Sequence, residues 1–144
     1  MRIIQVVGRS NSGKTTFIKA LIPELKKIGK VAAIKHLGDH EYHLEDGKDT
    51  TGFHDAGADF TIGIDSAKSV IAVRTNSLDT MLELLMQQGM DFVVIEGFKT
   101  NPFPKIVIGN LTIDNCILQN PDTTTVLSSL DQFAEYSGLP ADKR

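Results

Sequence analysis

Short, largely apolar runs alternate along this chain with longer stretches in which apolar residues recur every three or four positions. We expect the short runs to be strands, at residues 3–7, 31–34, 62–64, 70–73, 92–95, 106–108 and 117–118. The longest of them are β-branched and lack polar alternation, which is typical of strands buried on both faces of a parallel sheet, and we expect this of residues 31–34 as well. Helical spacing predicts helices over residues 17–28, 51–56, 78–86 and 126–136.

This order of elements predicts the fold class. Helices that separate apolar strands indicate an α/β fold, with a mostly parallel β-sheet flanked by helices. No linker or internal repeat interrupts the pattern, so we expect a single domain over residues 1–144. Residues 38–52 are polar, charged and punctuated by glycine, which predicts a long surface loop.

Composition and charge narrow the class of partner. The chain carries a net charge of −3, yet residues 1–36 hold eight basic residues and one acidic residue. A basic N-terminal part in an acidic protein predicts a local anionic ligand, and it argues against nucleic acid because no aromatic residues are interleaved with the basic ones. We expect neither a membrane span nor a secretion signal. The one cysteine, Cys116, suits a reducing cytoplasm, and its apolar neighbours predict a core position.

A phosphate-binding motif follows the first expected strand. Residues 8–15 read GRSNSGKT, which matches the pattern G-x-x-x-x-G-K-[ST]. The strand before it and the amphipathic helix after it are the context that this motif requires. We therefore expect a P-loop that binds a nucleotide through Gly8, Asn11, Ser12, Gly13, Lys14, Thr15 and Thr16.

Each residue type in the motif has a chemical reason. Glycine permits backbone conformations in which consecutive N–H groups turn inward and bind an anion. The helix that begins near Lys14 presents its free N–H groups and its positive dipole end to the same phosphates. Lys14 is expected to bridge the β- and γ-phosphates, and the Thr15 hydroxyl is expected to bind Mg²⁺.

An acidic residue is expected at the same edge of the sheet. Glu96 follows the apolar run 92–95, and the carboxyl ends of parallel strands form the ligand side of an open α/β sheet. We expect Glu96 to act in catalysis, by holding Mg²⁺ together with Thr15 or by orienting the attacking water. Asp91 precedes the strand, so it should lie at the opposite edge with a structural role.

The sequence does not determine which base the bound nucleotide carries. Many GTPases read guanine with an N-K-x-D motif after a late strand, and residues 119–122 read QNPD at a comparable place. Asp122 could accept hydrogen bonds from guanine, but an ordinary turn explains the same residues equally well.

Residues 35–49 form a second chemical cluster. We expect Lys35, His36, Lys48 and Asp49 to contact a second anionic ligand or the phosphates of the nucleotide. A metal site that uses His36, His40 and His43 with nearby acids is the alternative, although the spacing matches no tight zinc pattern.

Four segments together resemble one known family. GRSNSGKTT, LIPELKKIGKVAAIKH, GKDT with HDAGAD, and DFVVIEGFKTNPFPKI occur in this order. They resemble the MobB family, molybdopterin-guanine dinucleotide biosynthesis protein B, over about residues 3–108. The resemblance implies a P-loop fold of the deviant GTPase group that binds GTP and Mg²⁺, with at most weak GTPase activity and a homodimeric state.

The resemblance also implies partners. Members of the family are expected to act as adapters for the guanylyltransferase MobA, which joins GMP to molybdopterin, so a molybdopterin-type cofactor belongs among the expected ligands. Two alternatives are a small-molecule kinase and a metallochaperone GTPase. A kinase needs arginines in a lid to clamp the transferred phosphoryl group, and the four arginines of this chain do not lie in such a stretch. The histidines of the 35–49 cluster are the only support for the metallochaperone.

Overall fold

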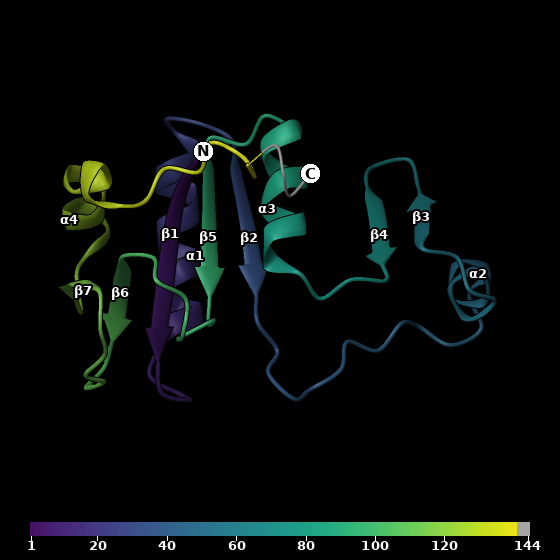
Figure 1. Cartoon of the computed structure of the whole chain (residues 1–144), viewed down its shortest axis with the longest axis horizontal. Coiled ribbons are helices and arrows are strands. Elements are labelled where there is room, and N and C mark those ends of the chain that lie inside the picture. The colour runs from purple at the N-terminus through teal and green to yellow at the C-terminus, as the bar shows by residue number, and fades with distance from the viewer. Residues whose placement is uncertain (141–144) are drawn as a thin grey trace.

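The computed structural model describes residues 1–140, and it confirms an α/β fold built on a parallel sheet (Figure 1). Five strands pair in the order β2-β5-β1-β6-β7, all of them parallel. Their bounds are Arg2–Gly8 for β1, Val31–Lys35 for β2, Phe92–Glu96 for β5, Lys105–Ile108 for β6 and Cys116–Gln119 for β7. The first strand of the chain is therefore the central strand of the sheet.

Helices cover both faces of this sheet. Helices α1 (Lys14–Lys26) and α4 (Thr123–Ser128) pack on one face, where Leu21, Leu25 and Val126 meet side chains such as Ile4 and Val6 in one hydrophobic cluster. Helix α3 (Leu78–Gln87) packs on the other face through Leu82. Because β1 and β5 face helices on both sides, residues 3–8 and 93–95 are buried, which is why these runs carry no polar alternation.

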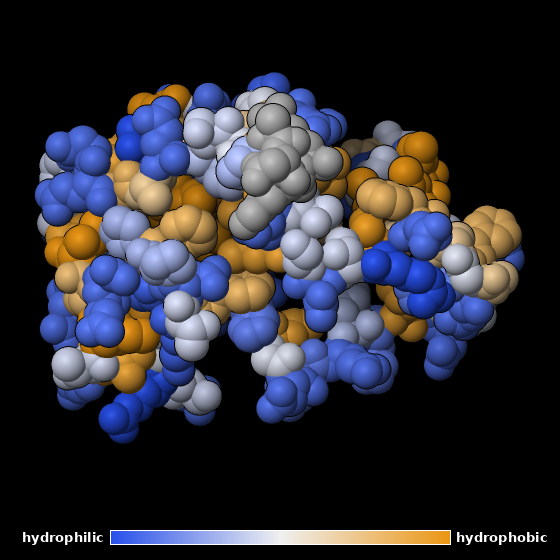
Figure 2. Space-filling model, viewed as in Figure 1, coloured by the Kyte–Doolittle hydropathy of each residue, from blue (hydrophilic) through white to orange (hydrophobic). Residues whose placement is uncertain are grey.

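A separate two-stranded sheet lies beside this body, beyond α3 (Figure 1). It is the antiparallel hairpin of β3 (Phe60–Ile64) and β4 (Ser69–Val73), and the short helix α2 (Asp49–Asp55) precedes it. One face of the hairpin exposes Phe60, Ile62, Ile64 and Ile71, each more than half accessible to solvent. Figure 2 shows hydrophobic side chains gathered over this part of the molecule.

The loop expected at residues 38–52 is present up to residue 48, and α2 begins at Asp49. Asp91 lies where it was expected, before β5, and its Oδ2 accepts a hydrogen bond of 2.7 Å from the Lys30 N–H. Gly29 leaves room for this contact, because a Cβ there would stand 2.8 Å from Asp91. Within residues 1–140, no helix is both long and apolar enough to cross a membrane.

Three expectations were wrong. The helix expected over 126–136 is instead α4, a 3-10 turn η1 (Leu130–Gln132) and an extended segment whose Glu135 bridges to Arg2. The strand at 31–34 is not buried on both faces, because β2 lies at the edge of the sheet and Ala33 is exposed. Cys116 is exposed rather than part of the core, since it begins β7 at the opposite edge.

Candidate functional site

The motif at residues 8–15 forms a tight loop between the central strand and the longest helix. Two of its residues, Asn11 (φ 58°) and Gly13 (φ 95°), adopt left-handed backbone conformations that turn the chain back on itself. Gly8 is needed for a different reason: a Cβ there would stand 2.5 Å from the Ile108 carbonyl oxygen and 2.6 Å from Ser12 Oγ. The loop is thus a close-packed backbone cradle that a side chain at position 8 would fill.

Helix α1 begins at the open side of this cradle. Gly13 is its N-cap and contributes no side chain, and no acidic residue occupies the first turn. The free N–H groups of the first turn and the positive end of the helix dipole are therefore not neutralised by a capping carboxylate or hydroxyl. Such a helix terminus favours an anion.

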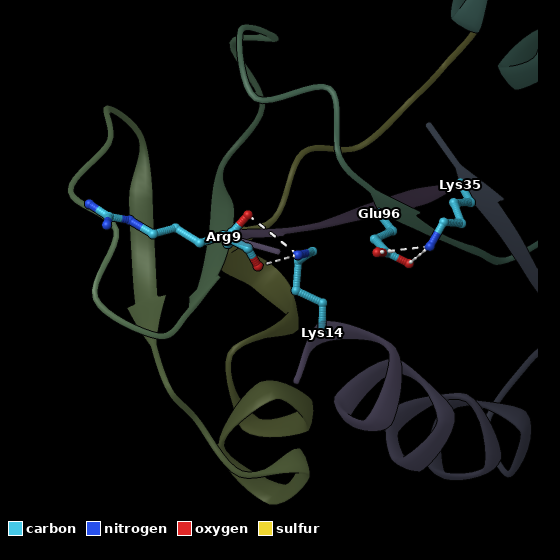
Figure 3. A network of polar contacts seen from close by, with 5 residues as sticks. Arg9, Lys14, Lys35 and Glu96 are labelled. Atoms are coloured by element: carbon cyan, nitrogen blue, oxygen red, sulfur yellow. Dashed lines mark hydrogen bonds and ion pairs between the residues drawn. The ribbon is translucent and has the colours of Figure 1, made fainter. Parts of the chain in front are cut away.

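Lys14 lies over the loop (Figure 3). Its Nζ donates to the Arg9 carbonyl at 2.7 Å and to the Gly8 carbonyl at 3.4 Å. The Arg9 side chain points away from Lys14 in the same view. The Lys14 ammonium is consequently held in place by backbone carbonyls of the loop.

A second cation and a carboxylate face this loop from neighbouring strands. Glu96 ends β5, Lys35 ends β2, and the two residues pair in the sheet register. The Lys35 Nζ lies 3.3 Å from Glu96 Oε1 and 3.4 Å from Oε2. The Glu96 side chain is only 15% exposed and that of Lys35 is 56% exposed, so the carboxylate sits deeper than its partner.

These groups enclose one pocket of about 510 Å³. This volume falls in the range of small-molecule sites, about 300–1,000 Å³. The residues that line it are Ser10, Asn11, Ser12, Gly13, Lys14, Thr15, Thr16, Lys35 and Glu96. The structure thus brings together the predicted loop residues other than Gly8, the predicted carboxylate and one of the predicted second-ligand residues.

The donors of this pocket suit a phosphate. Ser12 Oγ is buried and has no hydrogen-bond partner within residues 1–140, which leaves a polar atom in the cradle ready for a ligand. Among the same residues, no three His, Cys, Asp or Glu side chains gather into a group that could hold a metal ion unaided. A magnesium ion fits such a site only together with phosphate oxygens, which is the usual way in which proteins bind it.

The structure does not bring the other second-ligand residues to this pocket. His36 stacks on Phe98, with ring centroids 4.2 Å apart. Lys48 lines a different cavity of about 500 Å³, between residues 42–51 and the hairpin, and pairs there with Glu45 at 3.4 Å. Asp49 begins α2 and lines neither space.

Residues 119–122 are used within the fold. Asp122 is the N-cap of α4, and its Oδ1 accepts from the Thr125 N–H at 2.7 Å. These hydrogen bonds to Thr125 hold the pKa of the Asp122 carboxyl below its usual value. Asn120 Oδ1 accepts from the Gly109 N–H at 2.7 Å. Both side chains therefore have structural partners, as expected of the turn.

Two buried polar residues near the site were not singled out from the sequence. Gln5 is fully buried in β1, and Lys105 is 1% exposed at the start of β6. The signal for each was present: Gln5 interrupts an otherwise apolar run, and Lys105 directly follows a Pro-Phe-Pro turn ahead of a wholly buried strand.

Residues 3–129 match the family described as molybdopterin guanine dinucleotide synthesis protein B. A relative from Haemophilus influenzae, named molybdopterin-guanine dinucleotide biosynthesis adapter protein, is 34% identical over 91% of this chain and 70% of its own length. A Bacillus subtilis relative, given the same name as probable, is 35% identical over 96% of this chain and 83% of its own length.

Solved structures agree with these relatives. The crystal structure of Bacillus subtilis MobB superposes with a TM-score of 0.69 and 31% identity, covering 97% of this chain and 88% of that one. A MobB homologue from Bacillus stearothermophilus superposes with a TM-score of 0.56 over 94% of this chain and 74% of that one, and at 24% identity it supports the fold alone. The chain therefore belongs to the MobB family of molybdopterin-guanine dinucleotide biosynthesis adapter proteins.

Proposed function

We propose that this adapter binds GTP with Mg²⁺ in the pocket between the 8–13 loop and Glu96, and that it holds the nucleotide for a guanylyltransferase partner. The observation that carries the proposal is the cradle itself: an uncapped helix start and the Lys14 ammonium line one pocket, and Gly8, which begins the same loop, has no room for a side chain. The family membership supports the adapter role in making molybdopterin-guanine dinucleotide.

The residues that line the pocket would have distinct roles in binding the nucleotide. Backbone N–H groups of the loop and the start of α1 would bind the β-phosphate, and Lys14 would turn from the Gly8 and Arg9 carbonyls to the phosphates. Thr15 and Glu96 would hold Mg²⁺, which neutralises phosphate charge when it is bound. Lys35 sits beside Glu96, so it can either balance that carboxylate or contact a terminal phosphate.

A kinase has less support than an adapter with weak GTPase activity. Of the arginines within residues 1–140, Arg2 donates to the Phe133 carbonyl at the far end of β1 from the loop. Arg74 donates to the carbonyls of His54 and Ala58 beside the hairpin. Arg9 points away from Lys14 (Figure 3). The described residues therefore offer no arginine that could hold a phosphoryl group during its transfer.

We also propose that the protein is a homodimer that uses the exposed face of the β3–β4 hairpin. Phe60, Ile62 and Ile64 alternate along β3, and Ile71 lies opposite Ile62 in the register. A contiguous apolar face of this kind is uncommon on monomers, and a second copy of the same face is a complementary partner for it.

The test of nucleotide binding is a titration with GTP and with ATP, each with and without Mg²⁺. Lys14→Ala should abolish measurable triphosphate binding while the thermal unfolding midpoint without nucleotide stays that of the wild type. Lys19→Ala is the matched control, because it removes an exposed lysine from the same helix. Unchanged affinity in folded Lys14→Ala protein would overturn the proposed site, and equal affinity for GTP and ATP would overturn the guanine preference.

The adapter role needs its own assay. A guanylyltransferase supplied with molybdopterin and limiting GTP should form the guanine dinucleotide faster when wild-type protein is added. Lys14→Ala should give no stimulation. Equal stimulation by both proteins would show that the effect on the transferase does not pass through the nucleotide pocket.

A further inference from the structure

Two polar side chains lie next to each other in the middle of the parallel sheet. Gln5 in β1 and Lys105 in β6 are partners in the strand register, and both are buried almost completely. They stand on the face that α3 covers, in line with Ile3 and Ile95 of that hydrophobic cluster. At these positions a lysine and a glutamine take the place of apolar side chains. Both are costly to bury unless their hydrogen-bond donors are satisfied.

Both side chains donate to the same segment, residues 97–103. Gln5 Nε2 lies 2.6 Å from the Gly97 carbonyl oxygen and 2.6 Å from that of Phe98. Lys105 Nζ donates to the Phe103 carbonyl at 3.0 Å and also to the Asn101 carbonyl. The Lys105 ammonium has three N–H donors and no acceptor, so it can donate hydrogen bonds to several carbonyls of the segment at once.

The segment needs these donors because of its sequence. Pro102 and Pro104 have no N–H groups, and within residues 97–103 the Phe98 carbonyl alone accepts from the backbone of the segment, from the Asn101 N–H at 3.0 Å. Partly buried carbonyls without a partner are costly, and the two side chains supply the donors for those of Gly97, Asn101 and Phe103. They therefore determine the path that the chain takes between β5 and β6.

That path begins at the carboxylate of the pocket. Gly97 directly follows Glu96 and takes a left-handed conformation, with φ 97°, and Phe98 takes another, with φ 53°. The Gly97 N–H donates to the Val6 carbonyl at 3.1 Å, and the His36 N–H donates to the Glu96 carbonyl at 2.9 Å. The Phe98 ring then stacks on His36, the neighbour of Lys35. One continuous set of contacts thus runs from the buried pair to both members of the Lys35–Glu96 ion pair.

We propose that Gln5 and Lys105 are positioning residues of the nucleotide site: they hold residues 97–103 by their carbonyls and so fix the Glu96 carboxylate beside Lys35 at the pocket. This role rests on the nucleotide function proposed above. Burial lowers the pKa of Lys105, while the charge of Asp114 opposes that shift. The fold therefore keeps at this position an ammonium that is costly to bury, where a methionine of similar length would pack without that cost.

The test uses Lys105→Met and Gln5→Met, which keep side-chain length and remove the donors. Three quantities are measured for each variant: GTP affinity without Mg²⁺, GTP turnover with Mg²⁺ per folded molecule, and amide hydrogen exchange of residues 97–103. We expect metal-free affinity within about twofold of the wild type, and turnover lower by about tenfold or more, because small displacements of a catalytic group are costly. We expect exchange in the segment to be faster by about tenfold.

Val126→Ala is the control for general loss of stability. Val126 is buried in the hydrophobic cluster on the other face of the sheet, against which no residue of the 97–103 segment packs, so the change should lower the unfolding midpoint without changing turnover per folded molecule. Wild-type turnover and wild-type exchange in Lys105→Met and Gln5→Met would overturn the proposal, as would an equal loss of turnover in Val126→Ala.

Failure of the proposed function gives a different result. If wild-type protein binds no GTP, the nucleotide proposal falls, and turnover says nothing about positioning. Hydrogen exchange still decides whether Gln5 and Lys105 hold the segment, and the backbone amide chemical shifts of Lys35 and Glu96 in the same variants decide whether the pair fixes the surroundings of that carboxylate. Wild-type shifts of Lys35 and Glu96 in both variants would overturn the positioning role on their own.

Discussion

At the scale of single residues, Lys14 and Lys105 make the same kind of bond in opposite surroundings. Each ammonium donates to two backbone carbonyls. Lys14 does so at the rim of an open pocket, where leaving those carbonyls costs little because a ligand or water can replace the ammonium. Lys105 does so from a buried position, where the same movement would leave the partly buried Asn101 and Phe103 carbonyls without a partner. The first lysine is free to serve a ligand and the second is not.

Glu96→Gln separates catalysis from folding at the pocket. The change keeps the shape of the side chain and removes its charge, so we expect turnover of GTP with Mg²⁺ to fall while metal-free affinity stays equal or improves. Lys35 is largely exposed, so loss of the ion pair should cost about 1 kcal/mol of stability or less. Steady-state turnover and thermal unfolding measure the two effects. Glu24→Gln, which breaks the surface pair with Lys27, is the control. Wild-type turnover and metal dependence would remove Glu96 from the site.

The burial of Lys105 predicts that its contribution to the stability of the protein increases with pH. Its pKa is lowered in the folded state, so between that value and the ordinary 10.5 the unfolded chain binds more protons than the folded one. The stability that Lys105 contributes is therefore lowest at neutral pH and rises as the pH increases toward 10.5. Denaturant unfolding of wild type and Lys105→Met between pH 7 and pH 10 measures this, and the difference between them should shift in favour of the wild type. A difference that is constant or shifts toward Lys105→Met would contradict it.

At the scale of elements, the apolar pattern predicts most of the sheet because burial on both faces leaves a clear signal. The runs in β1, β5 and β6 have that signal, and so does the helix that follows the loop. The position of β2 could not be predicted in the same way: Val31 and Ile34 look alike in a central and an edge strand, and strand order depends on contacts between distant segments.

The end of the chain shows a second limit of the pattern. Val126 and Leu130 are spaced as in a helix, but α4 stops at Ser128 and Phe133 continues into an extended segment. That segment gains bonds to β1: the Ala134 carbonyl accepts from Ile3, and Tyr136 donates its N–H to the Met1 carbonyl. These long-range bonds replace helical ones, and local spacing contains no information about them.

The residues of the candidate site, too, could be predicted from the sequence only in part. The loop residues and Glu96 could be placed from the sequence because the ends of parallel strands share one edge. Lys48 could not be placed, since the path of a loop as long as 36–48 is not encoded in local spacing. Gln5 and Lys105 were not identified because their role appears only when residues 97–103 are folded over them.

The hairpin supplies a prediction at this scale. Ile62→Asp places a charge in the centre of the exposed face of β3–β4, where burial against a second copy would be costly. We expect a dimeric wild type and a monomeric variant in analytical ultracentrifugation at micromolar concentration. Ile28→Asp is the control, because Ile28 is an equally exposed isoleucine on the main body. A monomeric wild type would contradict the proposed dimer, and a dimeric Ile62→Asp would move its interface elsewhere.

At the scale of the whole molecule, nucleotide binding is linked to the stability of the sheet. The pocket uses the ends of β2 and β5 and the start of α1, so a ligand that binds there stabilises only the folded chain. At a GTP concentration about 100-fold above Kd, the free energy of unfolding should rise by about 2.7 kcal/mol. For a chain of this size, that corresponds to a Tm increase of roughly 5–10 °C. Differential scanning fluorimetry measures it, and Lys14→Ala is the control in which no increase is expected. An equal increase in Lys14→Ala would place the nucleotide outside this pocket.

The strand order also has a consequence for biosynthesis. β1 is made before both strands that flank it in the sheet, β5 and β6, which come after residue 91. Until then Ile3, Ile4, Val6 and Val7 have no sheet to join, so the nascent chain exposes apolar side chains. The floor of the cradle arrives later still, because Gly8 packs against the Ile108 carbonyl of β6. The motif at residues 8–15 can therefore become a binding site only after residue 108 has been made, about a hundred residues later.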